Sequence, residues 1–309
     1  MRKRTRVILN PAAGDGHASQ IEPEIEQHLA ELGFEHSTVH TERPGHASEL
    51  AVEAVAQGYE LLIGVGGDGT SNEIVNGLLG IDGQRSPVAY GSIPAGSGND
   101  FAAINGIPTQ VADACQLIAR QEVRKVDVAR ITVNDQPPRY GINTIGIGFD
   151  ALVTIETKRR PNARGLALYL PAVLRTIFVT LQPMRVAVTL DDAPTHMTSL
   201  MLTVGNGARE GHAFVVAPNA VCDDGLLDVL LVGTVSRLGM LGLLPRFFNG
   251  SHVRHKQITE HRCQRFSVRS EDPMPVHVDG EVIATDAHQI SVDIVQGALS
   301  MIKPNKSAL

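Results

Sequence analysis

Short apolar runs alternate with longer segments of helical periodicity along the first third of the chain. The apolar runs have the length of buried strands, and the segments between them carry apolar residues at helical spacing. The expected strands are residues 6–10, 35–41, 60–65 and 87–93, and the expected helices are 21–32, 46–57, one from about Thr70 or Asn72 and one from about Asp100. Alternation at this pitch predicts a mostly parallel sheet covered by helices.

The pattern changes beyond about Lys125. Short, alternating runs rich in β-branched residues, bounded by Gly, Pro, Asn and Asp, predict an antiparallel sandwich or barrel. These runs are residues 125–134, 184–192, 198–206, 225–235, 265–270, 274–284 and 289–295, with helical interruptions at about 150–181 and 236–249. The fold class expected is therefore α/β plus all-β: a nucleotide-type half, then a β half, with a cleft between them.

Composition narrows the class of protein. The net charge of −6 and the absence of Trp argue against a nucleic-acid partner, because such surfaces are usually basic and aromatic. Three cysteines without CxxC spacing suit a reducing compartment. The basic start has too short an apolar run for a secretory signal, and the longest apolar stretch, 165–181, contains Pro171 and Arg175. No transmembrane helix is expected.

Each glycine-rich segment of the first half follows an expected strand. In "GVGGDGT" the glycines at 64, 66 and 69 fit the dinucleotide fingerprint, but no acidic residue ends the next strand as that fingerprint requires. Asp68 would repel a bare pyrophosphate, whereas Mg²⁺ between the two would reconcile them. The spacing of Thr70 and Glu73 predicts a capping box at a helix that begins at Thr70, so helix amides would face a bound anion.

A second loop, "IPAGSGNDFA", repeats this chemistry. Gly96 and Gly98 permit close backbone approach, Ser97 offers a hydroxyl, and Asp100 supplies a second carboxylate or a helix cap. Two such loops favour a nucleotide phosphate site over a simple turn.

The late segment 274–284 carries further acidic residues. Period-two alternation places His277, Asp279 and Glu281 on one face of a strand. By itself the segment favours a solvated edge strand with an Asp-Gly turn. The acidic residues before Gly225 are typical of a turn as well.

The motifs "NPAAG", "GGDGT", "PAGSGNDFA" and "VDGE" together resemble the diacylglycerol kinase catalytic family, in particular its bacterial soluble lipid kinases, over essentially the whole chain. The resemblance implies an α/β nucleotide domain similar to NAD kinase and phosphofructokinase, over residues 1–127 and rejoined by about 297–309. It implies a β-sandwich lipid-substrate domain over 128–296.

The resemblance also implies roles for individual residues. Glu281 would accept the proton of the lipid hydroxyl, with Asp279 beside it, and Asp68 and Asp100 would organise the catalytic Mg²⁺. A structural Mg²⁺ would be held by Val221, Asp224 and Leu226. The implied nucleotide contacts are Asn10, Thr41, Gly66, Gly67, Asp68, Gly69, Thr70, Asn72, Gly96, Ser97 and Asn99. Helix capping is the alternative for Asn10, Thr41 and Asn72.

The function expected is a soluble, cytoplasmic lipid kinase that uses ATP and Mg²⁺ and visits the inner face of the membrane without spanning it. Diacylglycerol is the first substrate expected, with phosphatidylglycerol or a sphingoid base as alternatives. The apolar segments near Arg246, Arg254 and Lys256 suit either a core or an anionic membrane surface. A homodimer is compatible with the sequence. An NAD kinase-type enzyme and a non-catalytic nucleotide sensor remain as other classes.

Overall fold

The computed structural model describes residues 3–80, 88–159, 165–211 and 213–305. The chain forms two compact units, here called unit 1 (Met1–Val128, Cys222–Asp224 and Val295–Leu309) and unit 2 (Ala129–Val221 and Gly225–Ile294). Several residues of predicted elements lie outside the described part: Pro87 of a strand, 160–164 of a helical segment and 306–309 of the returning C-terminal segment. The predicted fold class, α/β followed by antiparallel β, is confirmed.

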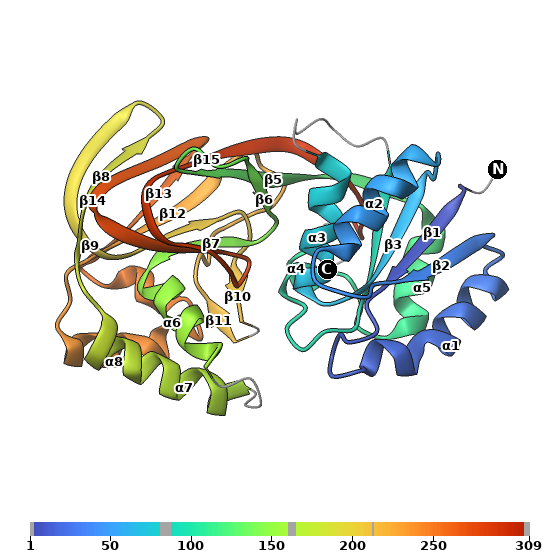
Figure 1. The fold of residues 1–309 in the computed structure, drawn as a ribbon, viewed down its shortest axis with the longest axis horizontal. Coiled ribbons are helices and arrows are strands. Elements are labelled where there is room, and N and C mark those ends of the chain that lie inside the picture. The colour runs from blue at the N-terminus through green and yellow to red at the C-terminus, as the bar shows by residue number, and fades with distance from the viewer. Residues whose placement is uncertain (1–2, 81–87, 160–164, 212, 306–309) are drawn as a thin grey trace. The chain divides into compact units, whose positions relative to one another are not determined.

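Unit 1 contains a parallel sheet in the order β15-β4-β3-β1-β2. Its strands are β1 (Thr5–Leu9), β2 (His36–His40), β3 (Leu61–Gly66), β4 (Ala89–Pro94) and the end of β15 (Glu281–Ile302). Its helices are α1 (His17–Glu31), α2 (His46–Ala56), α3 (Asp68–Leu79), α4 (Asp100–Ile104) and α5 (Val111–Arg120). Helices α2 and α3 pack together on one side of the sheet, and α1 and α5 on the other (Figure 1).

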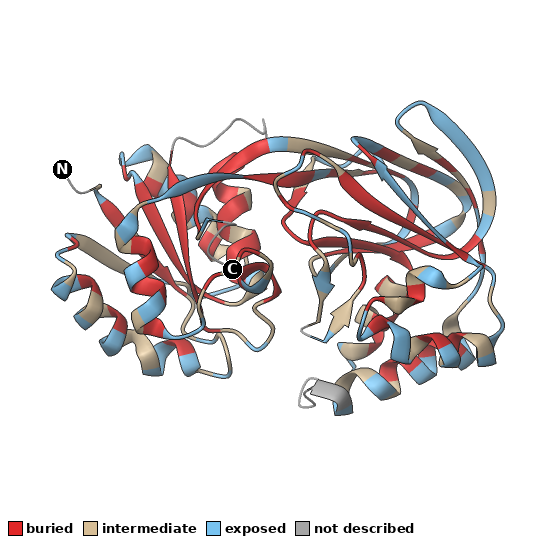
Figure 2. Ribbon diagram, turned by 180° about the vertical axis from the view of Figure 1, so that it is seen from behind, coloured by how far each residue is buried: buried red, intermediate tan, exposed pale blue. Residues whose placement is uncertain are grey.

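Burial explains why the strands of unit 1 read as continuous apolar runs. Strands β3 and β4 are buried at every position, and β1 at all but one (Figure 2). Central parallel strands have helices on both faces, so neither face can be polar. The edge strand β2 is only partly buried, and it carries more polar residues than the central strands do.

Unit 2 is mainly antiparallel. Its strands are β5 (Val123–Val133, which starts in unit 1), β6 (Arg139–Gly141), β7 (Thr144–Gly148), β8 (Met184–Leu190), β9 (Ala193–Gly205), β10 (Arg209–Glu210), β11 (Phe214–Val215), β12 (Leu227–Gly233), β13 (Ile258–Cys263), β14 (Arg265–Val278) and most of β15. Strands β9 and β14 each pair with β8 through one half and with β7 through the other. The predicted strand runs 265–270 and 274–284 are therefore parts of a single long strand and the hairpin that follows it.

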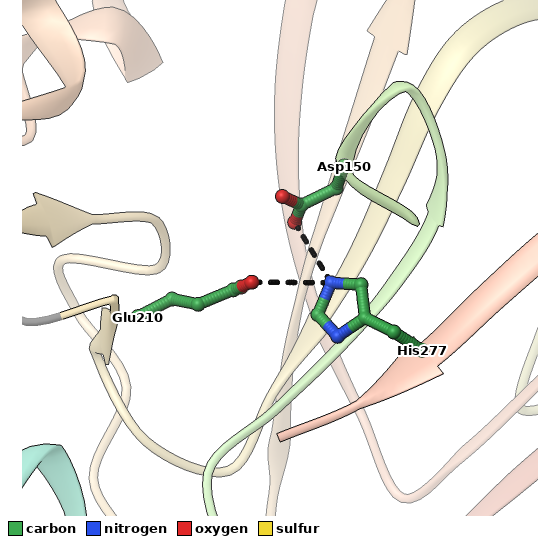
Figure 3. Close-up of side chains that lie close together, drawn as sticks. All are labelled: Asp150, Glu210 and His277. Atoms are coloured by element: carbon green, nitrogen blue, oxygen red, sulfur yellow. Dashed lines mark ion pairs between the residues drawn. The ribbon is translucent and has the colours of Figure 1, made fainter. Parts of the chain in front are cut away.

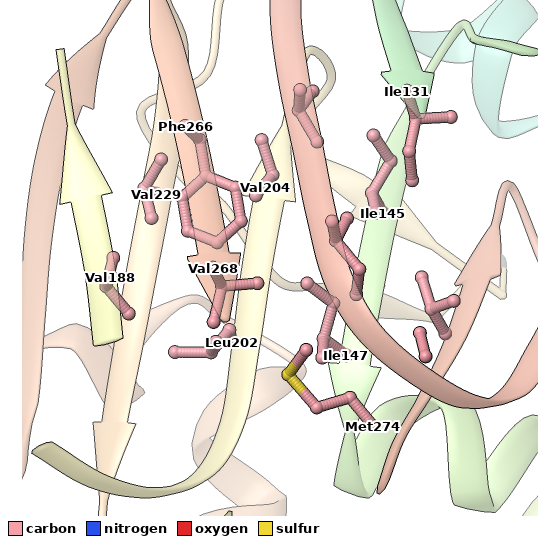
Figure 4. Packing of buried hydrophobic residues seen from close by; sticks show 14 of the residues in the cluster. Ile131, Ile145, Ile147, Val188, Leu202, Val204, Val229, Phe266, Val268 and Met274 are labelled. Atoms are coloured by element: carbon pink, nitrogen blue, oxygen red, sulfur yellow. The ribbon is translucent and has the colours of Figure 1, made fainter. Parts of the chain in front are cut away.

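Two hydrophobic cores stabilise unit 2. The first lies among the strands and includes Ile147, Leu202, Val229 and Phe266, all buried (Figure 4). The second joins the sheet to its helices, which are α6 (Phe149–Thr157), α7 (Gly165–Arg175), the π-helical turn η1 (Thr176–Thr180), α8 (Arg237–Phe247) and the 3-10 turn η2 (Ser251–Arg254). Within the described residues, no helix is both long enough and apolar enough to cross a membrane.

Candidate active site

Three loops meet at the carboxyl edge of the unit 1 sheet. They follow β1, β3 and β4, and because these strands are parallel all three loops leave the same edge (Figure 1). Ligands of such sheets bind beyond this edge. The loops are tied together by backbone hydrogen bonds: Asn10 N–H donates to the Val65 carbonyl at 2.9 Å, and Ala95 N–H donates to the Gly66 carbonyl at 2.8 Å.

Glycines are required here because the backbones of the loops touch. A Cβ on Gly67 would lie 3.1 Å from the Cα of Gly96, and a Cβ on Gly96 would overlap Gly67. A Cβ on Gly14 would overlap the carbonyl oxygen of Ala95, and Gly14 also has a φ of 62°. The sequence "GGDGT" and "AGSG" therefore reflects close packing of two loops, in addition to any ligand that they admit.

The carboxylates of Asp68 and Asp100 both lie close to Gly98. A Cβ on Gly98 would lie 2.9 Å from Oδ2 of Asp68 and 3.8 Å from Oδ2 of Asp100. Oδ1 of Asp68 accepts a hydrogen bond from the Phe101 N–H at 2.8 Å, which orients the carboxylate. Two carboxylate oxygens close to one residue are a donor set that suits Mg²⁺, so the residues fit the divalent ion that the resemblance implies.

The other predicted nucleotide contacts lie along the same edge. The Asn10 side-chain amide donates to the Thr70 hydroxyl at 3.0 Å, and Thr41 N–H donates to the Leu9 carbonyl at 2.9 Å. Asn99, at a φ of 58°, forms a closed pair of hydrogen bonds with the Gly96 backbone. Ser97 is exposed.

Asn72 is buried inside α3, and its side-chain and backbone oxygens both accept hydrogen bonds from the Asn76 amide at 3.1 and 2.9 Å. It therefore lies within the helix, where a capping role does not apply. Gly69 is exposed on the first turn of the same helix.

The predicted capping box is wrong. Helix α3 begins at Asp68 with Gly67 as its N-cap, and no side chain caps it. The Glu73 carboxylate instead accepts hydrogen bonds from the N–H groups of Gly45 and Ala47, at 2.8 and 3.1 Å. Glu73 thus caps the neighbouring helix α2, because tertiary packing offers it unpaired amides that sequence spacing does not show.

The predicted placement of three polar residues on one strand face is also wrong. β14 ends at Val278 and β15 starts at Glu281, so Asp279 and Gly280 form a two-residue hairpin turn. Their φ values of 49° and 81° are those of a type I′ turn, which favours Asp-Gly. The turn interrupts the alternation that the sequence suggested.

Asp279 stabilises a neighbouring loop. Its Oδ2 accepts a hydrogen bond from Ile142 N–H at 2.8 Å, and its Oδ1 accepts from Asn143 and Thr144 N–H, both at 2.9 Å. Three backbone donors occupy this carboxylate. Its geometry is that of a structural anchor.

Glu281 is held differently. Its Oε2 lies 2.7 Å from an Arg139 guanidinium nitrogen, and its Oε1 lies 3.5 Å from the other. The side chain is 58% exposed. The carboxylate is paired with one exposed arginine and stays accessible to solvent.

A cluster formed by the fully buried His277 and the partly buried Asp150 and Glu210 was not predicted. His277 is fully buried, and its Nε2 lies 3.1 Å from Oε1 of Glu210 and 3.4 Å from Oδ2 of Asp150 (Figure 3). The three residues come from β14, β10 and α6, so no sequence spacing links them. A signal did exist for His277 alone, since it stands between apolar residues at the end of a buried strand.

The cluster shifts the pKa of its members. Burial, with the charge of Asp150, raises the pKa of Glu210 to about 8. Burial lowers the pKa of His277, but the charges of Glu210 and Asp150 outweigh it and raise that pKa to about 9. Another histidine, His252, is also fully buried.

The predicted structural metal site lies in the turn before β12. Asp224 and Val221 are exposed, and Gly225 has a φ of 77°, which lets the chain turn sharply there. The neighbouring Asp223 carboxylate lies 3.7 Å from the buried Lys303 ammonium. The hard oxygen donors of Val221, Asp224 and Leu226 are of the type that Mg²⁺ takes, so the residues fit such an ion by chemistry.

Comparison with known proteins matches both halves of the chain. The family model described as diacylglycerol kinase catalytic domain matches residues 4–131. The model described as YegS C-terminal NAD kinase beta sandwich-like domain matches residues 143–303. Together the two matches account for the order of the α/β and β-sandwich parts.

Individual proteins match over nearly their whole length. Proteins named diacylglycerol kinase from Staphylococcus saprophyticus and Mycobacterium tuberculosis are each 28% identical, covering 91% and 97% of this chain and 90% and 95% of their own. A crystal structure of a diacylglycerol kinase from Bacillus anthracis shares the fold, with a TM-score of 0.75 and 24% identity over 99% of this chain and 98% of that one. A second structure from that organism aligns with a TM-score of 0.80 and 26% identity over 99% of both chains.

Proposed function

We propose that this chain, which belongs to the diacylglycerol kinase catalytic family, transfers the γ-phosphoryl group of ATP to the hydroxyl of diacylglycerol. Membership supports a lipid kinase with an alcohol acceptor and the use of ATP. The observation that carries the proposal is the meeting of the "GGDGT" and "AGSGND" loops. Where these loops meet, the carboxylates of Asp68 and Asp100 lie close to Gly98, and Asp68 accepts a hydrogen bond from a backbone N–H.

Unit 1 supplies the nucleotide site in this proposal. The loops after β1, β3 and β4 bind the phosphates through backbone N–H groups and the N-terminal end of α3, where the helix dipole favours an anion. Asp68 and Asp100 hold Mg²⁺, which neutralises charge on the phosphates as transfer proceeds. The hydrogen bond between the side chains of Asn10 and Thr70 joins the loop after β1 to the first turn of α3.

Unit 2 supplies the proton acceptor. The lipid hydroxyl must lose its proton as its oxygen attacks phosphorus, and a carboxylate within reach can accept it. Of the two acidic residues predicted for this step, Asp279 already accepts three backbone hydrogen bonds. Among the described residues Glu281 pairs with Arg139, and it is exposed, so we assign the proton to Glu281 and a positioning role to Asp279.

Peripheral contact with an anionic bilayer completes the proposal. Among the described side chains of α7, η1 and α8 and the residue just after α8, six large apolar ones are exposed: Leu170, Leu174, Phe178, Val179, Leu238 and Phe248. Arg175 and Arg246 stand at the ends of α7 and α8. Apolar residues with cations at their edge suit a membrane surface. Leu238→Ser should weaken cosedimentation with phosphatidylglycerol vesicles several-fold, whereas unchanged cosedimentation would contradict this contact.

The test is a transfer assay. Purified protein, γ-labelled ATP and Mg²⁺ are incubated with mixed micelles containing diacylglycerol, phosphatidylglycerol or sphingosine, and separately with NAD. We expect label in diacylglycerol, lost in Asp68→Asn and retained in Asp135→Asn, which changes an exposed turn residue. Label only in phosphatidylglycerol or sphingosine would overturn the substrate. Label only in NAD, or ATP binding with no labelled product, would overturn the lipid kinase assignment.

A further inference from the structure

Glu281 stands at the first position of β15, directly after the Asp-Gly turn. The ladder between β14 and β15 pairs Glu281 with Val278 and Val282 with His277, and its register then shifts. A register shift of this kind interrupts the ladder and bends the strand. Two paired positions give the start of β15 little rigidity of their own, so other contacts are needed to fix the direction of Glu281.

Three sets of contacts hold the turn in place. The Asp279 N–H donates to the Thr144 carbonyl at 2.8 Å, and the Asp279 carboxylate accepts from the N–H groups of residues 142–144. The Gly280 N–H donates to Nδ1 of His277 at 3.3 Å. This last contact involves the residue directly before Glu281. Gly280 is itself exposed, so without His277 its N–H would face solvent.

The ring of His277 is fixed by its surroundings. It is fully buried, and His277 pairs with Gly146 of β7, where a Cβ would overlap Nε2. The ring therefore needs the space that a glycine leaves on β7. Nε2 lies 3.1 Å from Oε1 of Glu210 and 3.4 Å from Oδ2 of Asp150 (Figure 3). One nitrogen of the ring thus faces the two carboxylates, and the other contacts the turn.

The carboxylates keep Nδ1 free to accept a hydrogen bond. An N–H group can donate to Nδ1 only if Nδ1 carries no proton, so the ring proton lies on Nε2. Burial lowers the pKa of His277, but the charges of Glu210 and Asp150, with that of Asp279, outweigh it. Burial raises the pKa of Glu210 to about 8, so a further proton can bind there instead of at Nδ1.

We propose that His277 is a positioning residue for phosphoryl transfer: its Nδ1 holds the Gly280 N–H and thereby fixes the turn that directs Glu281, while Asp150 and Glu210 hold the ring. The role of Glu281 rests on the proposed function. His277 acts through the turn and does not touch the reacting atoms. A misplacement of about 1 Å can cost on the order of 10²-fold in rate, so a backbone contact next to Glu281 is sufficient to matter.

Two substitutions separate the two nitrogens of the ring. Oδ1 of an asparagine lies two bonds from Cβ, as Nδ1 does, whereas the amide nitrogen of a glutamine lies three bonds from Cβ, as Nε2 does. His277→Asn therefore keeps an acceptor for the Gly280 N–H and leaves the two carboxylates without the ring. His277→Gln keeps a donor for the carboxylates and removes the acceptor for Gly280.

We expect the stability and the activity of these variants to rank in opposite orders. His277→Gln should retain a Tm close to that of wild type but lose about tenfold or more in kcat, with KM for ATP and lipid unchanged. His277→Asn should have the lower Tm and the higher kcat of the two. His196→Asn, at an exposed position in β9, is the control and should match wild type. A kcat that follows Tm, with His277→Asn the slower variant, would overturn the proposal.

Amide hydrogen exchange tests the contact without the reaction. Measured by NMR, the Gly280 N–H should exchange slowly in wild type and at the rate of an unstructured peptide in His277→Gln. Protection that is lost in His277→Gln supports the contact even if wild type transfers no phosphate, which would overturn the proposed function alone. Unprotected Gly280 in wild type, or equal protection in folded His277→Gln, would overturn the positioning role and leave the proposed function standing.

Discussion

Oδ1 of Asp68 accepts a hydrogen bond of 2.8 Å from the backbone N–H of Phe101, the second residue of α4. This contact joins the loop after β3 to the helix after β4. It also fixes the direction of Oδ2, which faces the same point as Oδ2 of Asp100. The Asp68 carboxylate is thus oriented by the fold before any ion or nucleotide binds.

Replacing Asp68 with Asn should separate folding from catalysis. The amide oxygen can still accept the Phe101 hydrogen bond, so Tm should change little. The charge that binds Mg²⁺ is lost, and we expect transfer to fall by about 100-fold or more, in line with the loss of one transition-state contact. Rates measured over a range of Mg²⁺ concentrations check this. A wild-type rate in Asp68→Asn would contradict the metal role.

Gly98→Ala should damage the same site from the other side. The new Cβ would lie 2.9 Å from Oδ2 of Asp68, so the carboxylate must shift from its position. We expect the Mg²⁺ concentration for half-maximal rate to rise about tenfold. Gly242→Ala, where a Cβ meets no atom within 4 Å, is the matched control. Equal Mg²⁺ dependence in both variants would show that the carboxylates do not share an ion.

Glu281→Gln should abolish transfer without loss of nucleotide binding. The amide cannot accept a proton, and we expect the rate to fall by about 10²- to 10⁴-fold. The ion pair with Arg139 is exposed, so its loss should cost about 1 kcal/mol of stability or less. ATP titration and the transfer assay are run on the same preparation. An equal loss of ATP binding would show that Glu281 is not the proton acceptor.

Glu73→Ala should destabilise α2 even though Glu73 lies in α3. It removes two hydrogen bonds to the amides of Gly45 and Ala47, and loss of a helix cap costs about 1 kcal/mol. Thermal unfolding should shift down by about 2–4 °C. Glu53→Ala, at an exposed position in α2, serves as control and should leave Tm within 1 °C or so of wild type, since exposed substitutions cost about 0.5 kcal/mol or less.

The Asp150–Glu210–His277 cluster should make stability fall as pH rises. The pKa of Glu210 is raised to about 8 and that of His277 to about 9, so between about pH 5 and 9 the folded chain binds more protons than the unfolded chain. Stability then decreases with pH across this window. Tm measured from pH 5 to 9 should decline, and Glu210→Gln, which cannot ionise, should flatten the curve. A curve of unchanged slope in that variant would contradict the assignment.

The sequence determined the architecture of unit 1 and the position of its loops. Parallel strands buried on both faces are mostly apolar along their length, and this pattern can be recognised in the sequences of β1, β3 and β4. Gly67 and Gly96 were identifiable because only glycine permits backbones to touch. The bounds of α2 and β3 were predicted to within a residue or two because their periodicity is local.

Only the tertiary structure decided the partners of individual polar groups. Glu73 has the spacing of a cap for its own helix but reaches the free amides of α2 instead. The turn at Asp279 and Gly280 breaks an alternation that looked continuous, because the register of β14 with β15 places the reversal there. Asp150, Glu210 and His277 lie far apart along the chain, and they meet only when α6, β10 and β14 come together. Local pattern records propensity and periodicity, whereas the satisfaction of buried polar groups depends on which distant atoms the fold brings within hydrogen-bonding distance.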